Sequence, residues 1–202
     1  MSWTRRDTQS NPPDDIILVD EHDRPLGTGQ KNQVHQAGLL HRAFSIFIVN
    51  SQGEWLLQQR AADKYHSSEL WSNACCSHPR PGESVQEAAG RRLTEELGVR
   101  VELEHLGHLV YRTNFEDGLE EHEFDHLFWA VYDGPFAPDP AEVADLRWIA
   151  PQQLREELKS APEKFTFWFR EVMAGQATGP GVEKLEMSGY PSGESAQSGL
   201  LP

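Results

Sequence analysis

Residues 77–99 read SHPRPGESVQEAAGRRLTEELGV, and this stretch decides the fold of the chain. Ser84 and Glu87 are three residues apart, the spacing of a capping box, in which a hydroxyl and a carboxylate satisfy free N–H groups at the start of a helix. Apolar side chains then recur every four residues up to Gly98, a residue type that readily ends helices. The stretch therefore predicts an amphipathic helix between Ser84 and Gly98.

Short apolar segments on both sides of this helix predict strands. The strands expected from these patterns are Ile16–Val19, Phe44–Val49, Trp55–Gln59, Val99–Leu109 and Glu121–Val131. Residues 50–54 are typical of a turn, so the second and third of these strands are expected to form a hairpin. A late helix, entered through Pro151, is expected over Gln152–Leu158. Strands interleaved with a few helices indicate an α+β or α/β sandwich.

Length and composition favour one folded domain with polar ends. The chain has 202 residues, of which 38% are hydrophobic, and a formal charge of −14. Residues 174–202 contain six Gly, three Pro and four Ser without periodicity, so we expect a disordered tail there and a flexible segment over residues 1–13. The folded domain is then expected over residues 14–173. An acidic chain is not expected to bind nucleic acid or an anionic membrane, because both require a basic surface.

The two cysteines of the chain, Cys75 and Cys76, are adjacent in sequence. Neighbouring cysteines rarely form a disulfide because the ring is strained, so we expect free thiols and a reducing cytoplasm. No apolar run approaches the roughly 18 residues of a membrane span, and residues 1–7 lack the apolar stretch of a secretory signal. Taken alone, the thiols favour a buried pair of small side chains over a reactive site.

The stretch from Ser77 to Val99 resembles the Nudix box, G-x5-E-x7-R-E-U-x-E-E-x-G-U, where U is a bulky aliphatic residue. The positions in register are Glu83, Arg91, Leu93, Glu95, Glu96, Gly98 and Val99. Ser77 replaces the first Gly of the box, and Arg92 replaces the Glu that follows its Arg. The resemblance implies a Nudix-like sandwich of a mixed β-sheet with flanking helices. In hydrolases of this superfamily the glutamates of the box gather magnesium, and Arg92 puts a cation in place of one of them.

Three further motifs resemble a narrower family, the type I isopentenyl-diphosphate isomerases, which share the Nudix fold. The motifs are LLHRAFS at residues 39–45, WSNACCSHP at residues 71–79 and EEHE at residues 120–123. This resemblance covers roughly residues 14–173. It implies a 1,3-allylic rearrangement of isopentenyl to dimethylallyl diphosphate through a tertiary carbocation, in isoprenoid biosynthesis.

The isomerase resemblance implies a divalent metal site built from three histidines and two glutamates. Its ligands here would be His35, His41, His78, Glu121 and Glu123. The residues alone support part of this, because Glu121 and Glu123 project from one face of an expected strand. Such a donor set suits Mn²⁺, Zn²⁺ or Mg²⁺. The remaining histidines are expected to be surface or hydrogen-bonded residues, namely His22, His66, His105, His108, His122 and His126.

The resemblance also assigns catalytic roles. Cys76 would lie on one face of the substrate, with Glu123 and Tyr111 on the other, while Cys75 would be structural. Trp168 would be the aromatic partner of the carbocation, since a dry indole face stabilises a cation. Without the resemblance, the aromatic residues 165–169 are equally well interpreted as core.

Four cations correspond to the family's diphosphate contacts. They are Lys31, Arg60, Lys64 and Arg92, and Mg²⁺ on Glu96 would bridge to the same diphosphate. Considered alone, Arg92 and Glu96 are four residues apart on a helix, and this spacing favours a surface ion pair; the register with the rest of the box reverses that preference. We expect no flavin or nucleotide cofactor, and a monomer or weak dimer whose partner is a small diphosphate.

Two other functions remain as alternatives. A Nudix hydrolase of a nucleoside or other diphosphate would fit the box, but Arg92 and the cysteine-histidine motif argue against it. An inactive metal- or diphosphate-binding module would use the same fold.

Overall fold

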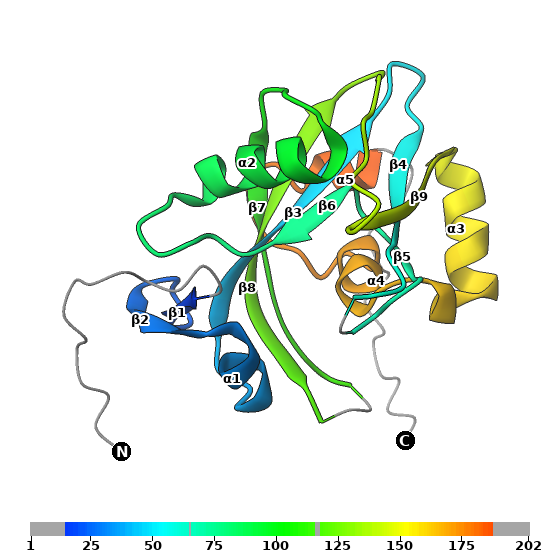
Figure 1. The fold of residues 1–202 in the computed structure, drawn as a ribbon. Coiled ribbons are helices and arrows are strands. Elements are labelled where there is room, and N and C mark those ends of the chain that lie inside the picture. Colours follow the sequence, from blue (N-terminus) through cyan, green and yellow to red (C-terminus); the bar gives the residue numbers. More distant parts are fainter. Residues whose placement is uncertain (1–14, 65, 116–117, 188–202) are drawn as a thin grey trace, which may run out of the picture.

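The computed structural model describes residues 15–64, 66–115 and 118–187 (Figure 1). The flexible segment expected over residues 1–13 and the last part of the expected tail, residues 188–202, lie outside the described residues.

The elements alternate between strands and helices, as the sequence patterns predict. The strands are β1 (Asp15–Val19), β2 (Pro25–Gln30), β3 (His41–Val49), β4 (Trp55–Arg60), β5 (Trp71–Ser72), β6 (Cys75–Ser77), β7 (Glu104–Asn114), β8 (Glu120–Val131) and β9 (Val143–Ile149). The helices are α1 (Lys31–Gln36), α2 (Val85–Leu97), α3 (Pro151–Ser160), α4 (Phe167–Met173) and α5 (Glu183–Met187), with a 3₁₀ turn, η1, at Pro162–Lys164.

Helix α2 is held at both ends by the residues that predicted it. The Glu87 N–H donates to Ser84 Oγ at 3.3 Å, and the Ser84 N–H donates to the Glu87 carboxylate at 3.0 Å. Gly98 ends the helix in a left-handed conformation with φ 68°. The apolar face of α2, which includes Ala89 and Leu93, is buried against the sheet.

The centre of the sheet is formed by β3, β8 and β7. Strand β3 pairs with β8 in parallel along its whole length, from His41 opposite Glu123 to Val49 opposite Val131, and β7 pairs antiparallel with the other edge of β8. The expected turn over residues 50–54 is present, but β3 and β4 pair only at Val49 and Trp55. Beyond that point β6 takes the place beside β3, and β4 pairs instead with β5 and β9.

Helices cover both faces of the sheet. One face packs Phe44, Ile46 and Phe128 against α2, and the opposite face packs Phe47 and Leu127 against α3, α4 and α5. Figure 1 shows α2 on one side of the strands and α3 and α4 on another. This arrangement confirms the expected sandwich of a mixed sheet with flanking helices.

Two boundaries differ from the sequence expectation. The strand expected to begin at Val99 begins at Glu104, because Val99 and Leu103 fill the core beside α2 and the pairing with β8 starts only at Glu104. The ordered chain also extends past Met173, where the disordered tail was expected to follow.

Residues 176–187 pack against β7 although their composition predicts disorder. Thr178 and His108 exchange backbone hydrogen bonds of 2.8 Å in each direction, and Leu185 is buried. Glycines permit this contact, because a Cβ at Gly107 would overlap the Thr178 carbonyl. A few specific backbone contacts therefore order a segment that has no periodic apolar pattern. None of the helices in the described ranges has the length and apolarity needed to cross a membrane.

We expect Ser84→Ala to lower the free energy of unfolding by about 1 kcal/mol, because the helix loses its N-terminal cap. Ser84→Thr keeps the hydroxyl and should retain most of the stability. Urea unfolding of both variants checks this, and equal destabilisation by Ala and Thr would contradict the capping role.

Candidate active site

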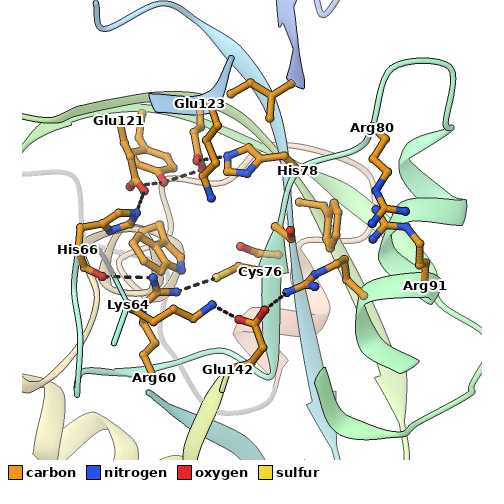
Figure 2. A pocket seen from close by; sticks show the side chains of 18 of the residues that line it. Arg60, Lys64, His66, Cys76, His78, Arg80, Arg91, Glu121, Glu123 and Glu142 are labelled. Atoms are coloured by element: carbon orange, nitrogen blue, oxygen red, sulfur yellow. Dashed lines mark hydrogen bonds and ion pairs between the residues drawn. The ribbon is translucent and has the colours of Figure 1, made fainter. Parts of the chain in front are cut away.

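A cavity of about 290 Å³ opens where β6 separates β3 from β4 (Figure 2). Its volume is near the lower end of the roughly 300–1,000 Å³ of small-molecule sites. The lining includes many of the residues that the sequence analysis singled out: Lys31, Arg60, Lys64, Cys76, His78, Arg92, Tyr111, Glu121, Glu123 and Trp168. Three other expected residues, His35, His41 and Glu96, are buried.

Three imidazoles and one carboxylate converge beside this cavity. One donor atom from each of His35, His41, His78 and Glu123 lies within 4.8 Å of the others. The Nε2 atoms of His35 and His41 are 3.1 Å apart, and His78 Nε2 is 3.0 Å from Glu123 Oε1. Since a single ion among these atoms could reach every donor, the residues present fit a divalent metal.

The register of the sheet builds this cluster. His41 on β3 and Tyr111 on β7 are both directly opposite Glu123 on β8, so the three side chains form a row across one face. The Leu39 carbonyl accepts a hydrogen bond of 2.8 Å from His41 Nδ1, which leaves the lone pair of Nε2 directed at the cluster. His35 enters from the short helix α1, which precedes β3.

Burial keeps two of the imidazoles uncharged. It lowers the pKa of His35 to about 2, with the neighbouring His78 and His41 adding to the effect. Burial likewise lowers the pKa of His78 to about 4, helped by Lys31. Uncharged imidazoles have the free lone pairs that metal ligands need.

The two glutamates of the EEHE motif are joined through Tyr111. The Tyr111 hydroxyl lies 2.7 Å from Glu123 Oε2 and 3.0 Å from Glu121 Oε2. Burial and the charge of Glu123 raise the pKa of Glu121 to about 8. Burial alone would raise the pKa of Glu123 too, but the His41 and His78 imidazoles outweigh it and hold that pKa well below its usual range. The pKa values of the two carboxyl groups are therefore shifted in opposite directions, and the Tyr111 phenol links the two groups.

Glu121 faces His66, which the sequence analysis had left among the surface or hydrogen-bonded histidines. His66 Nε2 is 3.0 Å from Glu121 Oε1, and its ring stacks on Phe115 and meets the Trp168 indole edge-on. Burial lowers the pKa of His66 to about 3, with Arg60 and Lys31 adding to the effect. Because His66 lies in a loop without periodicity or a motif, no local sequence signal marks it.

The two cysteines point to opposite faces of β6. Cys75 is fully buried in the core under α2, whereas Cys76 is partly buried and lines the cavity. Burial raises the pKa of Cys76 to about 12, against the opposing charge of Arg60, whose Nη1 lies 3.8 Å from the sulfur. The Arg60 guanidinium also lies 5.4 Å from the Trp168 ring centroid, so thiol, guanidinium and indole are neighbours.

Two of the four expected diphosphate cations, Lys64 and Arg92, lie on the other side of the thiol. Lys31 is instead near Glu123 and Glu121, whose charges oppose the lowering of its pKa by burial. Lys64 and Arg92 both form ion pairs with Glu142, and Figure 2 shows Lys64 directed at that carboxylate. Arg92 Nη2 is also 2.5 Å from Glu96 Oε1. Burial lowers the pKa of Lys64, although the charge of Glu96 opposes it.

The cavity also contains charged residues that the sequence analysis did not assign. Arg80 and Arg91 extend its basic lining, and Arg91 is held by a bidentate pair with Glu83. Glu142, from the turn before β9, is an acidic member of the same lining.

We expect His78→Ala to weaken divalent-metal binding by at least roughly tenfold. Substituting a residue that only hydrogen-bonds a metal ligand already lowers metal affinity by about that factor, and His78 would be a ligand itself. Metal analysis of the purified protein and metal titration of the apoprotein measure the effect. His22→Ala, which changes an exposed histidine, is the control. Equal metal affinity in the two variants would contradict a metal site at this cluster.

Comparisons with known proteins identify the family of the chain. Residues 39–169 match the family model of the NUDIX domain. The isopentenyl-diphosphate Delta-isomerase of Burkholderia multivorans is 54% identical over 154 residues, which cover 76% of this chain and 88% of that protein. The isopentenyl-diphosphate Delta-isomerase of Serratia proteamaculans is 51% identical over 158 residues, 78% of this chain and 88% of that protein.

Solved structures share the fold at lower sequence identity. A crystal structure of a Deinococcus radiodurans protein aligns with a TM-score of 0.61 at 18% identity, covering 87% of this chain and 99% of that one. Together with the family model and the curated relatives, the fold places the chain in a known family. It belongs to the isopentenyl-diphosphate Delta-isomerase family of Nudix-domain proteins.

Proposed function

We propose that this cavity converts isopentenyl diphosphate to dimethylallyl diphosphate, a step of isoprenoid biosynthesis. One observation carries the proposal: the Cys76 thiol and the Glu123–Tyr111 pair line the same cavity as a group of cations. Figure 2 shows Cys76 and Glu123 reaching this space from different elements. An alkene diphosphate bound among the cations would lie between two proton-carrying groups.

The reaction requires an acid and a base and no net change in composition. A proton adds to the terminal alkene carbon, C4, and leaves a tertiary carbocation at C3. A base then removes a proton from C2, and the electron pair of the broken C2–H bond forms the new C2=C3 double bond. We assign these transfers to Cys76 on one face and to Glu123 with Tyr111 on the other, because hydrogen-bond reach to the reacting carbon is the first requirement of a general acid or base.

Water must be kept from the carbocation, since it would trap the cation as an alcohol. Trp168 is buried, and its Nε1–H donates to Asn73 Oδ1 at 3.1 Å, which fixes the indole against the cavity. An aromatic face near a desolvated cation contributes about 2 kcal/mol. We therefore assign Trp168 to the carbocation wall.

The metal site acts on the Glu123–Tyr111 pair. His35, His41, His78 and Glu123 would hold the ion, and Glu121 would join them if its carboxylate turned from His66. A divalent ion there supplies positive charge that lowers the basicity of Glu123 and fixes its orientation beside Tyr111. The donor set suits Mn²⁺, Zn²⁺ or Mg²⁺.

The diphosphate is assigned to the basic part of the cavity. Lys31, Arg60, Lys64 and Arg92 supply its cations, and Mg²⁺ on Glu96 would offset further charge. Burial lowers the pKa of Lys31, with the nearby Glu123 and Glu121 opposing this effect. Guanidinium groups in such a site bind phosphate oxygens with charge-assisted hydrogen bonds.

Two features favour isomerisation over hydrolysis. Arg92 occupies a position of the Nudix box that holds a glutamate in the hydrolase pattern, and it forms ion pairs with Glu96 and Glu142. Hydrolysis of a diphosphate also has no use for the partly buried Cys76 thiol in the same cavity as a tyrosine-linked carboxylate pair.

We assign the enzyme to the reducing cytoplasm, because the proposed acid or base Cys76 must stay a free thiol.

Incubation with isopentenyl diphosphate and Mg²⁺ in D₂O should yield dimethylallyl diphosphate with deuterium in the methyl and C2 positions. Proton NMR measures the formation of dimethylallyl diphosphate and the deuterium at both positions. A phosphate assay should detect no release of phosphate from the substrate. Unchanged substrate would contradict the proposal, and phosphate released from nucleoside diphosphates would favour the hydrolase.

We expect Cys76→Ala to lower kcat by at least roughly 100-fold, the lower range for loss of a general acid or base. Metal content should be unchanged. Cys75→Ala is the matched control, because it removes the neighbouring thiol from the opposite face of β6 and should keep most of the activity. Similar activity of the two variants in the isomerase assay would remove Cys76 from the mechanism.

A further inference from the structure

Glu142 is an acidic residue among the cations assigned to the diphosphate. Its Oε2 pairs with Lys64 Nζ, and its Oε1 lies 2.8 Å from Arg92 Nη2. The carboxylate thus presents one oxygen to each of two cations, as a phosphoryl group would. The family resemblance and the Nudix box assign no role to this position.

The fold holds Glu142 firmly in this place. Its backbone carbonyl accepts a hydrogen bond of 3.0 Å from the N–H of Ala61, a buried residue between Arg60 and Lys64. Its own N–H donates to the Asp139 carbonyl at 3.0 Å, and β9 begins at the next residue. The backbone of Glu142 is therefore fixed to the loop that carries Lys64.

A negative charge at this position opposes diphosphate binding. The Glu142 side chain lines the cavity and is 23% exposed, so it is close enough to the proposed ligand to repel it. Arg92 already pairs with Glu95 and Glu96 as well as Glu142, so a phosphoryl group would be a fourth anionic partner of one guanidinium unless it replaced one of them.

We propose that Glu142 competes with the substrate's diphosphate for Lys64 and Arg92 and thereby limits diphosphate affinity. When the substrate binds, Lys64 and Arg92 each exchange the ion pair with Glu142 for one with a phosphoryl oxygen. Product release restores the ion pairs with Glu142. Glu142 is a positioning residue in this account, because it acts through the two cations and touches no reacting carbon. The proposal rests on the proposed diphosphate site.

Glu142→Gln is the direct test, because the amide keeps the shape of the side chain and removes its charge. We expect the metal-loaded protein to bind inorganic diphosphate about tenfold more tightly at fixed Mg²⁺, the combined effect of two partly exposed ion pairs. Isothermal titration calorimetry measures this affinity. The KM for isopentenyl diphosphate should fall by a similar factor.

Glu157→Gln is the matched control. Glu157 pairs bidentately with Arg147 away from the cavity, its side chain is 28% exposed, and its substitution changes the net charge by the same amount. It should leave diphosphate affinity unchanged. Glu142→Ala, which removes the whole carboxylate, should shift affinity in the same direction as Glu142→Gln, and thermal unfolding checks that each variant is folded.

The possible results separate this proposal from the function on which it rests. Unchanged diphosphate affinity of Glu142→Gln would overturn the proposal, because Glu142 would then not compete with the ligand. Weaker affinity would also overturn it, because Glu142 would then support the bound ligand, either by orienting the two cations or through Mg²⁺. Equal tightening by Glu157→Gln would also overturn it, by tracing the effect to net charge. If the wild-type protein binds no diphosphate, the diphosphate site itself is wrong.

Discussion

The parallel pairing of β3 with β8 is the constraint on which the site depends. It places His41 opposite Glu123, and the antiparallel partner β7 places Tyr111 opposite the same glutamate. Side chains alternate across a sheet, so a shift of one residue in either pairing would turn one partner of Glu123 into the opposite core. The large apolar residues farther along β3 and β8 resist that shift, because Phe47 and Leu127 are buried on one face while Ile46 and Phe128 are buried on the other.

Burial and charge are balanced differently in the two halves of the cavity. The metal cluster places three imidazoles around the Glu123 carboxylate, and burial lowers the pKa of two of them, His35 and His78, so these two supply lone pairs and no positive charge. The half with Lys64 and Arg92 concentrates cations on a chain whose formal charge is −14, and it does so by pairing them with acids. Anionic surface surrounding a small basic cavity favours a compact multivalent anion over an extended polyanion.

The features that could be predicted from the sequence are those set by residues close together along the chain. Helix α2 was predictable because its cap, apolar face and terminal glycine lie within fifteen residues of one another. The expectation that Cys75 is structural and Cys76 faces the site came from the resemblance, and alternation along β6 is its physical basis. His66 and Glu142 were not predictable, because each lies in a connection whose course is set by contacts with distant strands. The same applies to residues 176–187, which are ordered by backbone bonds to β7 that composition does not encode.

The opposite directions of the two thiols have a consequence for oxidative damage. A cysteine oxidised to a sulfenic acid is commonly rescued by a second thiol that closes a disulfide. Cys75 is the only other cysteine of the chain, and it points through the sheet into the core under α2. Cys76 therefore has no resolving partner within the protein. A Cys76 sulfenic acid would therefore be open to irreversible oxidation to the sulfinic acid unless a small external thiol entered the cavity. The raised pKa of Cys76 works against that first oxidation, because peroxide reacts with the thiolate and burial keeps the thiol protonated.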